Sequence, residues 1–134
     1  MNAHTAALDT SVIVRLLTSD PEDLAQLAFK RLKELHARGV APVVPDLVIA
    51  EAYFALHHYY KIEKEEAVKV LHAFVSSGQV ALEPGGVALE ALEWPGSKPG
   101  LVDRMIYLRA RAYAGEILTF DRDWKHLKHV LLLK

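Results

Sequence analysis

The chain has no cysteine among its 134 residues. Disulfide bonds, thiolate catalysis and cysteine-based zinc sites are therefore excluded. It also lacks any apolar run near the roughly 20 residues that a membrane-spanning helix needs. The first five residues contain none of the basic residues of a secretion signal. We therefore expect no membrane segment, no secretion signal and a cytoplasmic location.

The chain also has little net charge, formally -1, so its overall charge does not point to nucleic acid. The distribution is less even, since residues 101–134 contain seven Lys or Arg and four Asp or Glu. If some of those acids bind a metal ion, the remaining surface would be basic and could suit a phosphate backbone. A solvated surface of mixed charge explains the same residues equally well.

What the chain does have is enough apolar sequence for a core. Hydrophobic residues make up 51% of the chain, and its length suits one domain spanning residues 1–134. There is no internal repeat and no low-complexity linker. Short apolar segments alternate with longer helical patterns, which favours an α/β fold with a parallel sheet.

The predicted strands and helices follow from apolar periodicity and from punctuation by proline and glycine. The strands are predicted at Thr5–Leu8, Ala41–Val44, Val80–Glu83, Glu116–Phe120 and Val130–Leu133. The helices are predicted at Val12–Leu17 with a cap at Thr10 or Ser11, at Glu22–Arg38, from Pro45 or Asp46 to about Tyr60, at Glu63–Ser76, at Val87–Trp94, at Leu101–Ala114 and, as a single turn, at Trp124–Lys128.

Four acidic residues stand against apolar sequence: Asp9, Glu51, Asp103 and Asp121. Burying an unpaired carboxylate is costly, so such groups are normally paired or bind a metal ion. Asp9 and Asp121 follow predicted strands, where ligands of open parallel sheets bind. Glu51 and Asp103 lie on apolar faces near the starts of predicted helices, where the helix dipole favours an anion. The set predicts a site for a hard cation, although helix capping or partial exposure would explain any single member.

Two other groups of residues are candidate sites. His57-His58 and His126-x-x-His129 suggest zinc, but adjacent histidines diverge on a helix and the second pair lacks partners in register. We therefore interpret the histidines as surface or packing residues. The aromatic stretch Tyr53–Tyr60 indicates core packing, expected at Phe54, together with a surface for a second copy or a partner helix. Asp123 is expected to cap the turn that begins at Trp124.

Four segments, in this order, resemble the PIN-domain ribonucleases and, among them, the VapC-like toxins of toxin–antitoxin pairs. Leu8–Val14 is similar to the opening strand-and-turn motif of that family, and Val44–Glu51 to its second acidic segment. Gly100–Ile106 resembles the helix that carries the third acid, and Leu118–Trp124 the closing motif. Each segment alone is a weak match, but their order and predicted structural context make the set specific.

The resemblance implies a three-layer α/β/α sandwich around a parallel sheet of about five strands. It implies an endoribonuclease that uses one or two divalent ions, Mg²⁺ or Mn²⁺. Asp9 and Asp103 match the principal metal-binding acids, and Glu51 and Asp121 match the other two catalytic acids, with the choice of general base left open. Ser11 matches a small polar position that orients the first acid or a metal-bound water, and Thr119 matches a hydroxyl near the fourth acid.

The resemblance also implies partners, namely an RNA substrate, an antitoxin protein and a second copy in a homodimer. Val102 and Arg104 depart from the family pattern, which has small or aliphatic residues beside the third acid. Arg104 and Arg122 are candidates for contact with RNA phosphates, and Asp46 stands where a Ser or Thr cap is commoner. Two other functions stay open, an RNA-processing nuclease without an antitoxin and a non-catalytic module that binds RNA or protein.

Overall fold

The structure is a computed structural model that describes residues 5–134. Most of the N-terminal stretch in which we expect no secretion signal, residues 1–4, lies outside the described residues. The helices are α1 (Thr10–Thr18), α2 (Glu22–Ala37), α3 (Asp46–Phe54), α4 (Lys64–Val75), α5 (Ala88–Leu92) and α6 (Leu101–Arg111). A π-helical turn, Ala55–Tyr59, continues α3, and a 3-10 turn lies at Arg122–Trp124. The strands are β1 (Val43–Val44), β2 (Ala81–Leu82), β3 (Ile117–Thr119) and β4 (Val130–Leu132).

The strands pair in parallel, as the sequence predicts, but they form two separate pairs. β1 pairs with β2, and β3 pairs with β4. The predicted first strand is reduced to one parallel bridge between Ala7 and Val43. The α/β character of the chain is therefore confirmed, whereas residues 5–134 contain no continuous sheet of five strands in this structure. The predicted sandwich around such a sheet stays a prediction.

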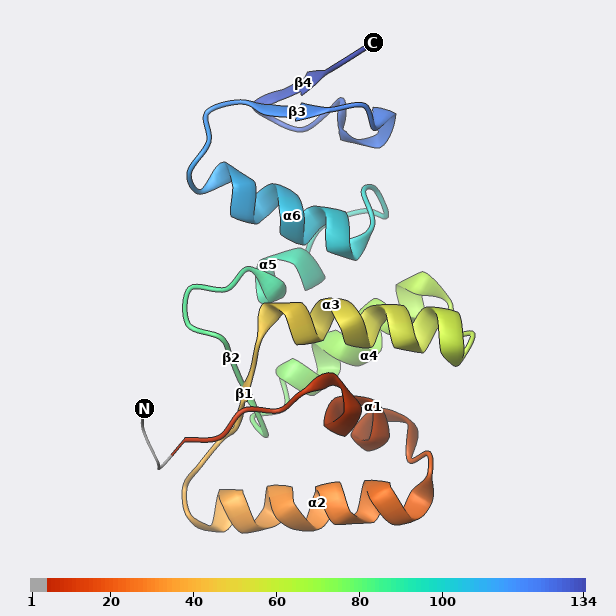
Figure 1. Cartoon of the computed structure of the whole chain (residues 1–134), viewed down its shortest axis with the longest axis vertical. Helices are drawn as coiled ribbons and strands as arrows, with labels where there is room; N and C mark the ends of the chain where they lie inside the picture. The colour runs from red at the N-terminus through yellow and green to blue at the C-terminus, as the bar shows by residue number, and fades with distance from the viewer. Residues whose placement is uncertain (1–4) are drawn as a thin grey trace.

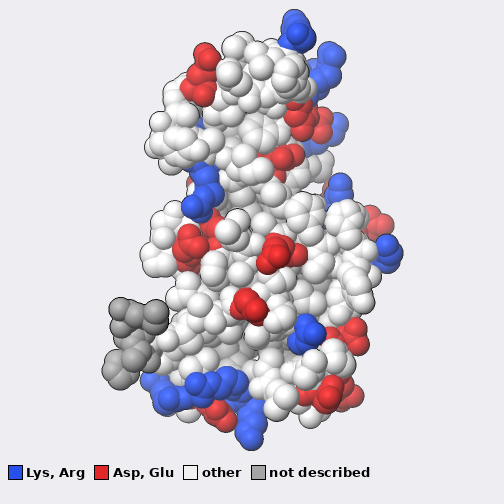
Figure 2. Space-filling model, viewed as in Figure 1, with Lys and Arg blue, Asp and Glu red and all other residues white. Residues whose placement is uncertain are grey.

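The elements are stacked along the long axis of the molecule (Figure 1). α2 lies at one end, followed by α1 and the β1–β2 pair, then by α3 with α4 and α5, then by α6, and the β3–β4 pair lies at the other end with the C-terminus. In the same view, Lys and Arg side chains gather over α2 at one end and near β3–β4 at the other, with several acidic side chains between them (Figure 2). Helices therefore separate the two strand pairs.

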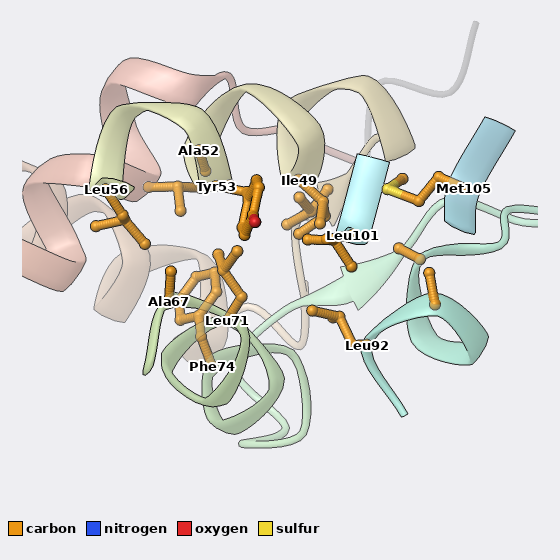
Figure 3. Close-up of a cluster of buried hydrophobic side chains, with 14 of the residues drawn as sticks. Ile49, Ala52, Tyr53, Leu56, Ala67, Leu71, Phe74, Leu92, Leu101 and Met105 are labelled. Atoms are coloured by element: carbon orange, nitrogen blue, oxygen red, sulfur yellow. The ribbon is translucent and has the colours of Figure 1, made fainter. Parts of the chain in front are cut away.

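The core lies where α3 meets α4, α5 and α6. Figure 3 shows Ile49 and Tyr53 of α3 near Leu71 of α4 and Leu101 of α6, and all four are buried. Each fully buried side chain of this size contributes about 1.5–3 kcal/mol from removal of apolar surface from water. The same contacts fix the directions of α3 and α6, which carry Glu51 and Asp103.

The aromatic stretch after α3 is only partly in the core. Tyr53 is buried, whereas Phe54, which the sequence assigns to the core, is exposed and stacks on His58. Tyr59 is also exposed, and the Tyr60 hydroxyl donates a hydrogen bond to Asp20. The prediction for Phe54 was wrong because Tyr53, one residue earlier, occupies the inward face of the helix.

No helix within residues 5–134 is both long and apolar enough to cross a lipid bilayer.

Candidate active site

Asp9 lies at the junction between the Ala7 bridge and α1. Its carboxylate is the N-cap of α1, since it accepts a hydrogen bond from the backbone N–H of Val12 at 3.3 Å. The Ser11 hydroxyl donates to the same oxygen at 2.6 Å. The Ser11 hydrogen bond is the main reason that the pKa of Asp9 lies below its ordinary value. The cap predicted at Thr10 or Ser11 is therefore Asp9 itself, held ionised and facing solvent.

Glu51 lies beside this junction, although it is far from Asp9 in the sequence. The Thr10 hydroxyl donates to Glu51 Oε1 at 2.7 Å, and this bond links the start of α1 to α3. The Glu51 side chain is exposed. Because Thr10 directly follows Asp9, this hydrogen bond holds Glu51 near Asp9. We call Asp9 and Glu51 the N-terminal acidic pair.

Asp103 lies in the first turn of α6 and is partly buried. Burial raises its pKa above the ordinary value, and the negative charge of Asp121 raises it further. A hydrogen bond from the Trp124 indole opposes these effects, and the charge of Asp123 adds to them. Asp103, Asp121 and Asp123 therefore lie near one another, and we call them the C-terminal acidic group.

Asp121 is held by the turn that follows β3. Its backbone N–H donates to the Thr119 hydroxyl at 3.0 Å, and its carboxylate accepts from the backbone N–H of Asp123 at 2.9 Å. Asp121 is thus the N-cap of the 3-10 turn Arg122–Trp124, so the capping role predicted for Asp123 was wrong. The Asp123 carboxylate instead lies 3.9 Å from the ammonium group of Lys98.

The four predicted acids do not converge in this structure. They lie in two places, the N-terminal acidic pair and the C-terminal acidic group, and no described residue links the two by a hydrogen bond. Within residues 5–134 no three Asp, Glu, His or Cys side chains lie together as a metal-binding group, which leaves the histidines without a zinc site as well. The prediction of a single cluster is therefore not met by one chain in this arrangement.

Asp9, Glu51 and Asp121 are exposed, which is the alternative that the sequence leaves open for any single member of the set. The buried carboxylate is Asp46, which is 2% exposed. It accepts hydrogen bonds from the backbone N–H groups of Val87 and Ala88, at 2.9 and 3.2 Å, and pairs with Arg109 at 2.7 Å. Asp46 thus stabilises the start of α5 rather than capping its own helix.

A sequence signal for this buried contact exists in hindsight at Gly86. A Cβ atom at that position would lie 2.5 Å from Asp46 Oδ1, so only glycine lets the chain approach the carboxylate so closely. Gly86 lies just before α5, whose N-cap residue, Val87, has no side chain that can cap the helix. This pattern indicates that a carboxylate from another segment of the chain caps the helix.

Arg104 does not face solvent, although the sequence makes it a candidate for RNA contact. Its side chain is 5% exposed, and its guanidinium donates to three backbone carbonyls, those of Ala91, Gly96 and Pro99. Since these bonds hold the loop between α5 and α6, Arg104 positions Asp103 by fixing the start of α6. The other candidate, Arg122, is exposed next to Asp121.

Comparison with known proteins places the chain in a family. The PIN domain family matches residues 6–130. A VapC ribonuclease from Aquifex aeolicus (strain VF5) is 26% identical over 122 residues, covering 90% of each chain. No solved structure shows significant similarity to the chain. Because the family match includes all four acids and nearly the whole sequence, the chain belongs to the PIN-domain family.

Proposed function

We propose that this chain is an endoribonuclease that hydrolyses RNA phosphodiester bonds with the help of Mg²⁺ or Mn²⁺. The observation that carries the proposal is the presence of all four acids at the motif positions, each at the end of a strand or on a core helix and each open to solvent at least in part. Membership of the PIN-domain family and the similarity to a VapC ribonuclease support it.

The donor chemistry of the four acids fits a divalent ion, because hard cations prefer carboxylate oxygens. The arrangement of the acids within one chain does not form a site for such an ion, since no three such side chains of residues 5–134 lie together. An ion held by such acids would lower the pKa of a bound water and neutralise charge on a phosphate.

The hydroxyl residues act as positioning residues for the acids. Ser11 fixes the rotamer of Asp9, Thr10 fixes that of Glu51, and Thr119 fixes the backbone of Asp121. The two groups of acids differ in their protonation. Asp103 has the raised pKa and accepts a proton before Asp9, whose pKa is lowered. Asp9 therefore stays negative under conditions in which Asp103 can exchange a proton.

The substrate side of the proposal rests on the basic residues near the C-terminal acidic group. Arg122, Lys125 and Lys128 are exposed and close in sequence to Asp121. Phosphate groups of a single-stranded RNA would be attracted to this surface, with an affinity that falls as salt rises. Arg104 is excluded from the contact because its guanidinium is buried and donates to three backbone carbonyls.

We also propose that the chain is the toxin of a toxin–antitoxin pair. Leu47, which is 80% exposed, and Phe54 lie four and three residues from Glu51 on α3, so the three side chains share one face of the helix. An apolar segment of an antitoxin bound on this face would cover Glu51. Binding would then block the N-terminal acidic pair directly, which is a physical route to neutralisation.

The test is cleavage of a pool of single-stranded RNA by purified protein with Mn²⁺ or Mg²⁺. Cleavage that disappears with EDTA supports a metal-dependent ribonuclease, whereas RNA that stays intact with bound protein indicates a non-catalytic module. Growth arrest on expression, relieved by the product of a short reading frame beside the gene, separates a toxin from an RNA-processing nuclease.

A further inference from the structure

The two strand pairs each end in an open parallel edge. Leu8 donates to Val43 O and Val43 donates to Ala6 O, so the N–H and C=O of Ala7 point to the opposite side. Ile117 donates to His129 O and Leu133 donates to Thr119 O, so the N–H and C=O of Leu118 point away from β4. No backbone partner within residues 5–134 bonds to either edge. Exposed edges of this kind are templates for further strand pairing.

The two edges are complementary in direction and register. In a parallel pair, a residue that directs both of its backbone groups at the partner strand lies opposite one that directs them away. Ala7 can therefore lie opposite Thr119, and Leu118 opposite Ala6, whereas Ala7 and Leu118 cannot lie opposite each other. In this register Asp9 lies level with Asp121. The strands then form one sheet in the order β2, β1, the Ala6–Leu8 segment, β3 and β4.

The apolar surfaces on either side of these edges also match. Beside Ala6–Leu8 lies a cavity of about 250 Å³ lined almost entirely by apolar side chains of α1 and α2, among them Val12, Leu16 and Leu32. On the other strand pair, Leu118 is 57% exposed and Phe120 is 76% exposed. Joining the two edges would cover both surfaces.

Contacts within the chain hold the two edges apart. The β3–β4 pair is fixed to α6, because the Tyr107 hydroxyl donates to Lys128 O at 2.9 Å and the Tyr107 ring packs edge-on against Trp124. α6 is fixed in turn by the buried guanidinium of Arg104. Helices lie between the two strand pairs (Figure 1). A second copy can supply each missing edge without breaking any of these contacts.

We propose that two copies of this chain pair reciprocally, each adding its β3–β4 pair to the Ala6–Leu8 edge of the other. Each active site then takes Asp9 and Glu51 from one copy and Asp103 and Asp121 from the other. Such an exchange gives a closed two-fold dimer with two identical interfaces. The catalytic part rests on the proposed function, whereas the pairing of the strands is independent of it.

The pairing is tested with introduced cysteines, since the chain has none of its own. Ala6→Cys and Leu118→Cys are made as separate variants, unfolded together, refolded and oxidised. Neighbouring strands bring Cα atoms about 5 Å apart, within the range that a disulfide spans. The expected result is a covalent dimer that contains one copy of each variant. Leu47→Cys, exposed on α3, replaces Leu118→Cys in the matched control and should give none.

The double variant Ala6→Cys/Leu118→Cys separates exchange from closure within one chain. Exchange predicts a covalent dimer at low protein concentration. A disulfide-bonded monomer, or a chain that forms no disulfide and elutes as a monomer in light scattering, would overturn the proposal. Non-reducing gels and light scattering give these results, and neither measurement needs enzymatic activity.

The shared site is tested by mixing two inactive variants, Asp9→Asn and Asp103→Asn, and refolding them together. In a mixed dimer, one of the two sites receives Asp9 and Asp103 from the copies that keep them. Half of the dimers are mixed at random, so about a quarter of wild-type cleavage should return. No recovery, with active wild-type protein, contradicts the exchange but leaves the ribonuclease intact. If the wild-type protein is inactive but the cysteine variants form the expected cross-links, the ribonuclease proposal is contradicted and the exchange of strands is not.

Discussion

In the N-terminal acidic pair, Asp9 and Glu51 each accept a hydrogen bond from a neighbouring hydroxyl. In the C-terminal acidic group, burial raises the pKa of Asp103, and the negative charges of Asp121 and Asp123 raise it further. The first pair is oriented by donors that favour its negative charge. The second group carries charge that the protein compensates only in part, through the Trp124 indole and through Lys98 at 3.9 Å from Asp123.

This difference teaches that position in a motif does not fix the electrostatic state of an acid. The charge of Asp9 contributes stability, because its carboxylate caps α1 and accepts the hydrogen bond from Ser11. The charge of Asp103 opposes folding, because the carboxylate is partly buried near other negative charges, and a bound cation would relieve this cost.

Asp46 is a third kind of acid, buried and hydrogen-bonded, and its replacement should have the largest effect on stability. Asp46→Ala removes the acceptor for two backbone N–H groups and the partner of Arg109. We expect a loss of about 2–4 kcal/mol in the free energy of unfolding, measured with urea. Asp23→Ala, on the exposed first turn of α2, is the control and should cost only a few tenths of a kcal/mol. Equal costs for the two variants would refute the role of Asp46.

Divalent ions should stabilise the folded protein, because they bind the acids only where folding or pairing brings these together. At a hundredfold excess over its dissociation constant, Mn²⁺ should add about 2.7 kcal/mol to the free energy of unfolding. Thermal unfolding with and without Mn²⁺ measures this, and Asp103→Asn should abolish the shift. An unchanged midpoint at saturating Mn²⁺ would mean that the acids do not form a site.

Asp9→Ala should destabilise the protein by about 1 kcal/mol, because α1 loses its N-cap. Asp9→Asn keeps a capping oxygen and should cost less. The pKa of Asp9 is lowered in the folded state, so its charge contributes stability above the unfolded value of 3.8, and this stability is lost as pH falls through the lowered pKa. A rise in stability of Asp9→Ala at neutral pH would place Asp9 in a repulsive cluster instead.

Asp103→Asn should have the opposite and smallest effect, a gain of less than about 1 kcal/mol in EDTA at neutral pH. The folded pKa of Asp103 is raised, so its charge opposes folding at any pH above that pKa. The penalty fades as pH falls from the raised pKa toward the unfolded value of 3.8. Urea unfolding at neutral and acidic pH should therefore show a gain that disappears in acid. A loss of stability at neutral pH would contradict the assignment.

Local sequence patterns predicted the elements well because their signals are local. Pro21 and Gly39 bracket α2 in the sequence, and the observed helix spans Glu22–Ala37. Each predicted strand lies at or within a few residues of an observed strand or bridge. The sequence does not determine whether the two strand pairs join into one sheet within a single chain. That depends on where α6 places β3 relative to the Ala7 bridge.

The site was predicted by residue type and motif, whereas its contacts depend on pairs that are distant in sequence. The Thr10–Glu51 bond joins residues 41 apart, and the Asp46–Arg109 pair joins residues 63 apart. Apolar neighbours did not bury Glu51, because Leu47 on the same face is itself exposed. Periodicity identifies a face of a helix but does not say whether another element covers that face.

The central claim, that these acids cleave RNA, is tested most directly by one assay with folded Asp103→Asn and wild-type protein. Both are incubated with a single-stranded RNA pool in Mn²⁺, with and without EDTA, and circular dichroism confirms that the variant is folded. We expect wild-type cleavage that EDTA abolishes, and a loss of about a hundredfold or more in the variant, as befits removal of a metal-binding charge. Full activity in folded Asp103→Asn, or wild-type activity that survives EDTA, would contradict the account.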